Sequence, residues 1–118
     1  TENFIQTQNG EQRADKFTVK DLNGAVRTLV NWTQTQNGDQ RADKCTETYS
    51  DGEIRTFKNY RKTQNGEKRA DKLTIKDRSD ETKIIKNWIL QNGEQRADKL
   101  TIEYPNGDVS TLVNWTQP

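Results

Sequence analysis

Hydrophobic and polar residues alternate in short segments along most of this chain. In residues 13–20, one face of an extended segment would carry Arg13, Asp15, Phe17 and Val19. In residues 26–34, the corresponding face would carry Val26, Thr28, Val30, Trp32 and Gln34. A period of two is typical of a β-strand, and β-branched residues, which favour strands, are frequent in these segments. Because no segment has the 3.6-residue period of an amphipathic helix, the pattern predicts an all-β protein.

Turn signals divide the chain at nearly even intervals. Asn-Gly and Asp-Gly steps favour two-residue hairpin loops, because both central residues of such a loop need positive φ. The signals, including one weaker Ser-Asp step, begin at Asn9, Asn23, Asn37, Asp51, Asn65, Ser79, Asn92 and Asn106. They predict about nine antiparallel strands, within residues 1–8, 11–22, 25–36, 39–50, 53–64, 67–78, 81–91, 94–105 and 108–118.

One block of sequence recurs four times and gives the chain a period. It reads TQNGEQRADK, TQNGDQRADK, TQNGEKRADK and LQNGEQRADK, at intervals of 28, 28 and 27 residues. A period in this range is typical of a repeat architecture. The sequence therefore predicts a single domain, residues 1–118, made of four tandem repeats of two strands each. The repeats are approximately residues 6–33, 34–61, 62–89 and 90–117.

An antiparallel up-and-down meander has two exposed edge strands unless it closes on itself. Eight strands from four repeats reach the size at which side chains can fill a barrel. We therefore expect a closed β-barrel, with an open single-layer sheet as the alternative. Residues 1–8 resemble residues 29–36, and residues 108–118 resemble residues 25–35. The two chain ends could thus pair with each other, or exchange between two molecules of a homodimer.

The turns also predict which residues lie opposite one another on neighbouring strands. A two-residue loop at Asn23-Gly24 would place Asp15 opposite Trp32. The equivalent loops would place Asp43 between Trp32 and Tyr60, Asp71 between Tyr60 and Trp88, and Asp98 beside Trp115. Because the interval before Asn92 is one residue shorter, we also expect a bulge or a slip in residues 88–91.

The composition limits both the core and the partners. Hydrophobic residues make up only 28% of the chain, which leaves intrinsic disorder as an alternative, but disorder also needs a high net charge and here it is +1. The 19 basic and 18 acidic residues are interspersed, which argues against a nucleic-acid partner, because such proteins need a one-sided basic surface. With no long apolar run and no targeting segment, we expect a soluble protein, secreted or cytoplasmic, and no membrane insertion.

The residue types that most catalysis and metal binding require are missing. The chain has no His and a single Cys, so no Ser-His-Asp triad, Cys-His pair or zinc site can form. Cys45 takes the position that Phe17, Leu73 and Leu100 take in the other repeats, which predicts a buried hydrophobic side chain. Each Gly lies alone in a turn, so there is no phosphate-binding loop. We therefore expect no enzyme activity, no metal and no cofactor.

Polar and aromatic side chains recur together in a pattern that suggests sugar binding. Carboxylate, amide and guanidinium groups match paired sugar hydroxyls, and an aromatic ring packs on the apolar face of a pyranose. Several weak sites on one scaffold gain strength through effective concentration. The candidate residues are Gln8, Asn9, Gly10, Arg13, Asp15, Trp32, Gln36, Asn37, Gly38, Arg41, Asp43, Tyr60, Gln64, Asn65, Gly66, Arg69, Asp71, Trp88, Gln91, Asn92, Gly93, Arg96, Asp98 and Trp115.

In architecture and composition the chain resembles the small lectins built from internal tandem repeats. The resulting prediction is a multivalent lectin with about four similar sites, one per repeat, that bind glycans or glycoproteins. The alternative is a structural or protein-interaction repeat module, natural or designed, that binds no sugar. In that alternative the Trp residues form the core and the Arg and Asp residues form structural ion pairs.

Overall fold

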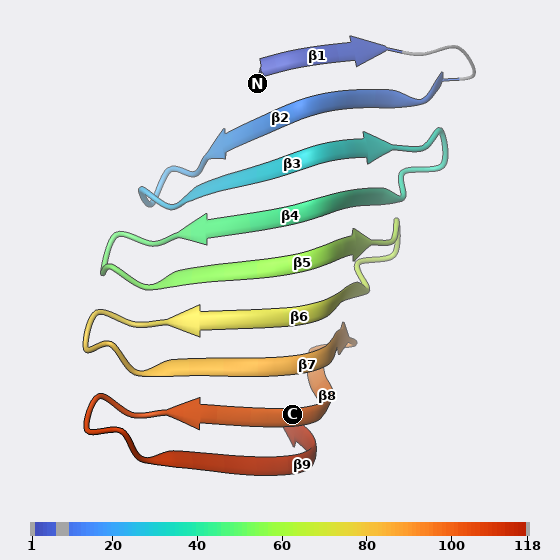
Figure 1. Cartoon of the computed structure of the whole chain (residues 1–118). Helices are drawn as coiled ribbons and strands as arrows, with labels where there is room; N and C mark the ends of the chain where they lie inside the picture. Colours follow the sequence, from blue (N-terminus) through green and yellow to red (C-terminus); the bar gives the residue numbers. More distant parts are fainter. Residues whose placement is uncertain (1, 7–9, 118) are drawn as a thin grey trace.

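In the described part of the chain, nine antiparallel strands form one continuous sheet in the order of the chain (Figure 1). The computed structural model describes residues 2–6 and 10–117, and these contain no helix. The strands are β1 (Glu2–Gln6), β2 (Gln12–Lys20), β3 (Val26–Gln34), β4 (Gln40–Thr48), β5 (Ile54–Lys62), β6 (Lys68–Lys76), β7 (Thr82–Gln91), β8 (Glu94–Glu103) and β9 (Val109–Gln117). Each predicted segment contains one strand, so the all-β meander is confirmed.

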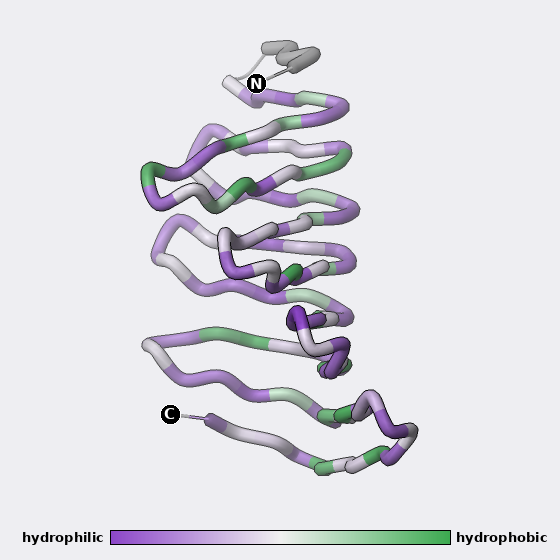
Figure 2. The backbone as a smooth tube through the Cα atoms, turned by 90° about the vertical axis from the view of Figure 1, so that its left-hand side faces the viewer, coloured by the Kyte–Doolittle hydropathy of each residue, from purple (hydrophilic) through white to green (hydrophobic). Residues whose placement is uncertain are grey.

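The sheet does not close, and the predicted barrel is wrong. Among the described strands, β1 pairs only with β2 and β9 pairs only with β8, so the two end strands lie at opposite ends of the sheet. The molecule is elongated, with extents of 50 × 27 × 22 Å. Seen from the side, the strands curve round instead of lying flat (Figure 2). The core is therefore enclosed by the curvature of the sheet, and no contact between β1 and β9 is needed to cover it.

The bend occurs at an Asn residue in the middle of alternate strands. Asn31, Asn59, Asn87 and Asn114 all have φ of 54° or 55°, in the left-handed region that Asn tolerates better than most residues. In β5, Phe57 and Tyr60 are both buried, whereas Lys58 and Asn59 between them are exposed. Residues three apart in a regular strand point to opposite faces. The left-handed Asn thus resets the alternation, so that both halves of the strand turn apolar side chains inward.

The strict alternation expected from the sequence is therefore wrong across the bend. Ala14 is buried although it was expected on the face opposite Phe17, which packs against the core. The neighbouring strands bend at the matching place: in β4, Ala42 and Cys45 are buried and the two residues between them are exposed. The inner face of the sheet then carries all the large side chains of the core.

Two rows of inner side chains run across the strands and pack on each other. Cross-strand pairing gives one row that alternates small with large residues: Ala14, Trp32, Ala42, Tyr60, Ala70, Trp88, Ala97 and Trp115. The other row consists of Phe17, Leu29, Cys45, Phe57, Leu73, Ile85, Leu100 and Leu112. Ring centroids lie 4.5 Å apart between Phe17 and Trp32 and 5.2 Å apart between Phe57 and Trp88. Bending brings these rows together and buries the aromatic surface that dominates the core energetics.

Except at Asn92-Gly93, the described loops are longer by one residue than the turn signals predicted, which changes the register. The amide of Asp21 donates to the carbonyl of Ala25 and the amide of Gly24 donates to the carbonyl of Asp21, which defines a three-residue loop. This shift pairs Ala14, and not Asp15, with Trp32. Because a one-residue slip moves every side chain to the other face, the predicted Asp–aromatic pairs are wrong. In the later strands Ala42, Ala70 and Ala97 take the places predicted for Asp43, Asp71 and Asp98.

The interval before Asn92 is one residue shorter because the loop between β7 and β8 is one residue shorter than the other described loops. Asn92 and Gly93 have φ of 53° and 78°, and Gln91 pairs with Glu94, so this hairpin has a two-residue loop. Pairing continues without interruption from Leu90 with Gln95 to Ile89 with Arg96. The bulge or slip predicted for residues 88–91 is therefore absent, because the loop shortens and the strand register is kept.

The left-handed conformation of Asn59 predicts how substitutions at this position change stability. Val at position 59 would force a β-branched side chain into the left-handed region, whereas Gly accepts that conformation at no steric cost. We expect Asn59→Val to be less stable than Asn59→Gly by about 1–2 kcal/mol. Both variants lose the Asn59 side-chain amide, so Asn59→Gly is the matched control. Urea unfolding followed by tryptophan fluorescence measures the difference, and equal stabilities would contradict the assigned conformation.

Candidate functional site

The side chains that point away from the core form three polar rows across the outer face of the bend. The first, the arginine row, consists of Arg13, Thr33, Arg41, Arg61, Arg69, Ile89, Arg96 and Thr116. The second, the acid–amide row, alternates Asp15, Asn31, Asp43, Asn59, Asp71, Asn87, Asp98 and Asn114. The third, the lysine row, consists of Lys16, Val30, Lys44, Lys58, Lys72, Lys86, Lys99 and Val113.

Side chains of the acid–amide row are held by hydrogen bonds between neighbouring strands. The Nδ2 of Asn31 donates to Oδ2 of Asp43 at 2.8 Å, and the Nδ2 of Asn59 donates to Oδ2 of Asp71 at 2.6 Å. Asn87 donates to Asp98 in the same way at 2.6 Å. Each of these bonds uses the Asn that bends its strand, so one residue type sets both the backbone conformation and the orientation of the carboxylate.

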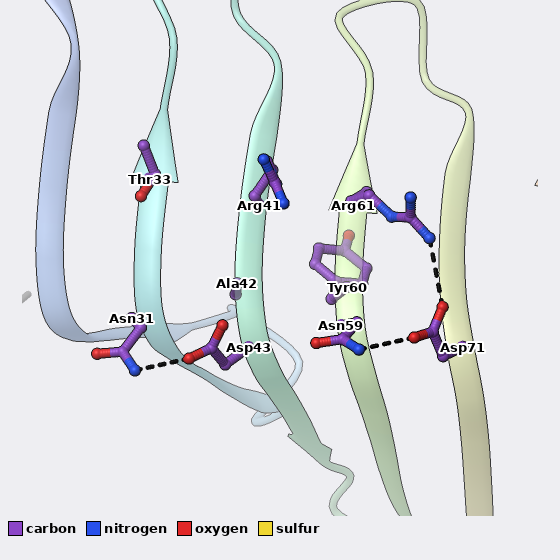
Figure 3. Close-up of a pocket in the computed structure, with 9 residues that line it drawn as sticks. All are labelled: Asn31, Thr33, Arg41, Ala42, Asp43, Asn59, Tyr60, Arg61 and Asp71. Atoms are coloured by element: carbon purple, nitrogen blue, oxygen red, sulfur yellow. Dashed lines mark hydrogen bonds and ion pairs between the residues drawn. The ribbon is translucent and has the colours of Figure 1, made fainter.

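A polar hollow of about 520 Å³ lies at the centre of the outer face (Figure 3). We call it the central hollow; its lining residues are Asn31, Thr33, Arg41, Ala42, Asp43, Asn59, Tyr60, Arg61 and Asp71. The Nη2 of Arg61 lies 3.4 Å from Oδ1 of Asp71, whereas Arg41 forms no ion pair with another described residue. Carboxylate, amide and guanidinium groups from four strands, β3 to β6, therefore meet in one solvent-exposed place.

Similar groups line two smaller hollows on either side. The β2–β4 hollow, of about 400 Å³, contains Arg13, Asp15, Asn31 and Asp43 among its lining residues. The β7–β9 hollow, of about 250 Å³, is lined by residues that include Asn87, Arg96, Asp98 and Asn114. Asp43 lines both the central and the β2–β4 hollow. The Arg and Asp residues selected from the sequence thus come together at several places along the sheet.

Among the described residues, Trp32, Tyr60 and Trp88 do not form an exposed platform beside these groups. Trp32 and Tyr60 are each 3% exposed and Trp88 is 4% exposed, because their rings belong to the core. The indole Nε1 of Trp32 donates to Oε1 of Gln40 at 3.1 Å, and that of Trp88 donates to Oε1 of Gln95 at 3.0 Å. Trp115, near the sheet edge, is only partly buried. A ligand in the central hollow therefore cannot stack on Tyr60, although this residue lines it.

The turn residues selected from the sequence lie at the ends of strands, apart from the three hollows. The side chain of Asn37 accepts a hydrogen bond from the amide of Asp39 at 3.3 Å and also contacts the hydroxyl of Thr35. Gly10, Gly38, Gly66 and Gly93 have positive φ. Gln8 and Asn9 lie outside the described residues. Of the other selected turn residues, Gln36, Asn37, Gln64, Asn65, Gln91 and Asn92, none lines a hollow of the acid–amide row.

The sequence interpretation missed a buried acid on the inner face. Glu47 is 8% exposed and takes a position that Val19, Ile75 and Ile102 take on equivalent strands. Its carboxylate accepts hydrogen bonds from Nε of Arg27 at 2.9 Å and from the hydroxyl of Tyr49 at 2.7 Å. The presence of Glu at a position that is aliphatic on the equivalent strands could have predicted this buried acid. Both carboxylate oxygens have partners, which is how a buried charge is tolerated in a core.

No metal site emerges from the described part of the chain. Residues 10–117 contain no group of three or more His, Cys, Asp or Glu side chains placed to hold a metal ion. No helix of the described residues has the length and apolarity needed to cross a membrane. Comparison of the chain with protein-family models, curated proteins and solved structures found no match.

Buried ionisable groups of the core predict alkaline sensitivity. Burial, reinforced by the charge of Glu47, raises the pKa of the Cys45 thiol to about 12. Burial, followed by the hydrogen bond to Glu47, raises the pKa of Tyr49 to about 12, and burial also raises the pKa of Tyr60. The unfolded chain ionises first, near the usual pKa of Cys and Tyr, so the folded state loses stability as the pH rises through that window.

We therefore expect the free energy of unfolding to fall between about pH 9 and pH 12. In Cys45→Ala the fall should begin about one pH unit later, because only the tyrosines then contribute. Urea unfolding at a series of pH values measures this, and the slope is compared instead of the absolute stability because the smaller side chain also leaves a cavity. Identical pH profiles for the two proteins would contradict the burial of Cys45.

Proposed function

We propose that the protein is a carbohydrate-binding protein that uses the polar hollows of its outer face. The observation that carries the proposal is the convergence of Arg41, Asp43, Asn59, Arg61 and Asp71 from neighbouring strands in one open hollow. Sugar hydroxyls both donate and accept hydrogen bonds, so they match carboxylates that accept and guanidinium and amide groups that donate. The residues keep this arrangement on rigid strands, which favours specific recognition.

Affinity in this proposal comes from polar contacts repeated along the sheet and not from stacking on aromatic rings. Four tandem repeats, as read from the sequence, would present the same group several times. Single sites of this kind bind weakly, and a ligand that reaches several of them at once binds more tightly through effective concentration. A glycan chain therefore fits the proposal better than a free monosaccharide.

The proposal can be tested at Asp43, because this residue lines both the central and the β2–β4 hollow. Asp43→Ala removes a carboxylate from two hollows, whereas Asp98→Ala removes one from a single hollow. We expect Asp43→Ala to weaken glycan binding more than Asp98→Ala does. Asp51→Ala, in an exposed turn away from the hollows, is the matched control and should leave binding unchanged. Glycan-array screening followed by titration calorimetry measures these differences. Absence of binding to every glycan would contradict the proposal.

A structural or protein-interaction module is the second candidate, and the free edge of β9 favours it. The sequence of β9 differs from that of β3 only at Ser110, which replaces Arg27. β3 pairs on both sides, whereas β9 pairs only with β8 among the described strands. An edge strand offers unpaired backbone groups to a further strand. The homodimer with exchanged terminal strands remains a prediction. In such a dimer the free edge of β9 would pair with a strand of the second molecule.

A further inference from the structure

The fold separates the charges that are interspersed in the sequence. The arginine and lysine rows together contain eleven basic residues: Arg13, Arg41, Arg61, Arg69, Arg96, Lys16, Lys44, Lys58, Lys72, Lys86 and Lys99. All eleven are exposed. The only acids among them are the four Asp residues of the acid–amide row. Most other acids, such as Asp51 and Asp80, lie in or beside the turns, so the outer face is basic although the whole chain is nearly neutral.

The lysine row is the least favourable part of this arrangement. Lys44, Lys58, Lys72, Lys86 and Lys99 lie directly opposite one another on five consecutive strands, β4 to β8. Neighbouring strands are about 4.8 Å apart. None of these five lysines forms an ion pair with a described residue. Like charges directly opposite each other destabilise a sheet, so the free protein gains nothing from this row.

A line of anionic groups would remove this repulsion. A polyanion lying across the strands would meet one ammonium group per strand and would release its counterions on binding. On the other side of the acid–amide row, Arg41, Arg61 and Arg69 are also consecutive cross-strand partners. Arg61 lies 3.4 Å from Asp71 and Arg69 lies 2.9 Å from Glu67, whereas Arg41 forms no ion pair with a described residue and offers a bidentate contact to sulfate or carboxylate. Two cationic rows thus flank a central row whose Asp and Asn side chains suit hydroxyl groups.

We propose that the ligand of the outer face is an acidic glycan, a sugar chain carrying sulfate or carboxylate groups, that lies across the strands. This inference rests on the carbohydrate-binding function proposed above and names its substrate class. The anionic groups bind to the lysine and arginine rows, and the hydroxyl groups bind to the acid–amide row between them. The ligand needs both kinds of group, because the outer face presents cations and hydrogen-bonding carboxylates side by side.

A nucleic acid fits this face less well, despite its charge. Binding of single strands relies on aromatic side chains on which the bases stack, and none of the three rows contains an aromatic residue. The four carboxylates in the central row would also lie against the phosphate backbone and repel it. These carboxylates find partners in sugar hydroxyls but not in phosphates, which is why the observations favour a glycan.

The test compares three probes on the full chain: heparin, which is a sulfated glycan, dextran, which is neutral, and duplex DNA. One variant carries Lys58→Gln, Lys72→Gln and Lys86→Gln, which removes the middle of the lysine row. The control variant carries Lys20→Gln, Lys76→Gln and Arg78→Gln, which removes the same net charge outside the three rows. Calorimetry at several salt concentrations gives the affinity and its salt dependence, and urea unfolding confirms that both variants fold.

We expect heparin to bind more tightly than dextran and DNA. The lysine-row variant should lose at least about tenfold in affinity for heparin, and its slope of log K against log salt should fall by about two to three. The control should stay within about twofold of the original protein. Removing the cross-strand repulsion should leave the unfolding midpoint of the lysine-row variant unchanged or raised. This combination of results supports the inference.

Other outcomes overturn it in distinguishable ways. If dextran binds as tightly as heparin and neither variant differs, carbohydrate binding stands and the acidic class is wrong. If no glycan binds, both proposals fail. If DNA binds as tightly as heparin, or the two variants weaken binding equally, the face attracts any polyanion through net charge and the specific role of the rows is rejected.

Discussion

The left-handed conformation of one Asn in alternate strands determines the rest of this structure. A regular strand of this sequence would leave Phe57 and Tyr60 on opposite faces, and neither face would be apolar enough to bury. Asn59, with a φ of 54°, puts both rings on the same side. The same happens at Asn31 and Asn87. A chain with only 28% hydrophobic residues can therefore enclose a core within a bent sheet without closing a barrel.

The same constraint creates the outer face. Because two successive residues point outward at each bend, the strands place Asn59 and Lys58, or Asp71 and Lys72, side by side in solvent. The side chain of the bending Asn then holds the Asp of the next strand, as Asn59 does with Asp71 at 2.6 Å. The polar rows are thus the external consequence of the internal packing. The proposed site therefore lies on residues whose backbone conformation is fixed by the bend, which would preorganise it.

The sequence was sufficient to predict the strands and turns but not the register or the faces. Alternation and the Asn-Gly, Asp-Gly and Ser-Asp turn signals located the nine described strands, because these signals are local. The predicted register was wrong by one residue because the loop that ends at Gly24 has three residues. An Asn-Gly dipeptide is compatible with both two-residue and three-residue loops, so the sequence alone does not give the loop length. The prediction of which residues share a face was wrong because alternation assumes a regular strand, and the sequence pattern does not show that an Asn in mid-strand has positive φ. Arg41 and Asp43 were brought together as predicted, since both lie on the same side of the bend.

The central claim is that the ligand binds on the face opposite the aromatic rings. A nitrogen-15 NMR titration with heparin oligosaccharide tests it most directly, because the side-chain amides of Asn31, Asn59 and Asn87 and the indole N–H groups of Trp32 and Trp88 give separate signals. The account predicts that the Asn amide signals shift as ligand is added and that the two buried indole signals stay in place. Large shifts of the indole signals with unchanged Asn amides would contradict it.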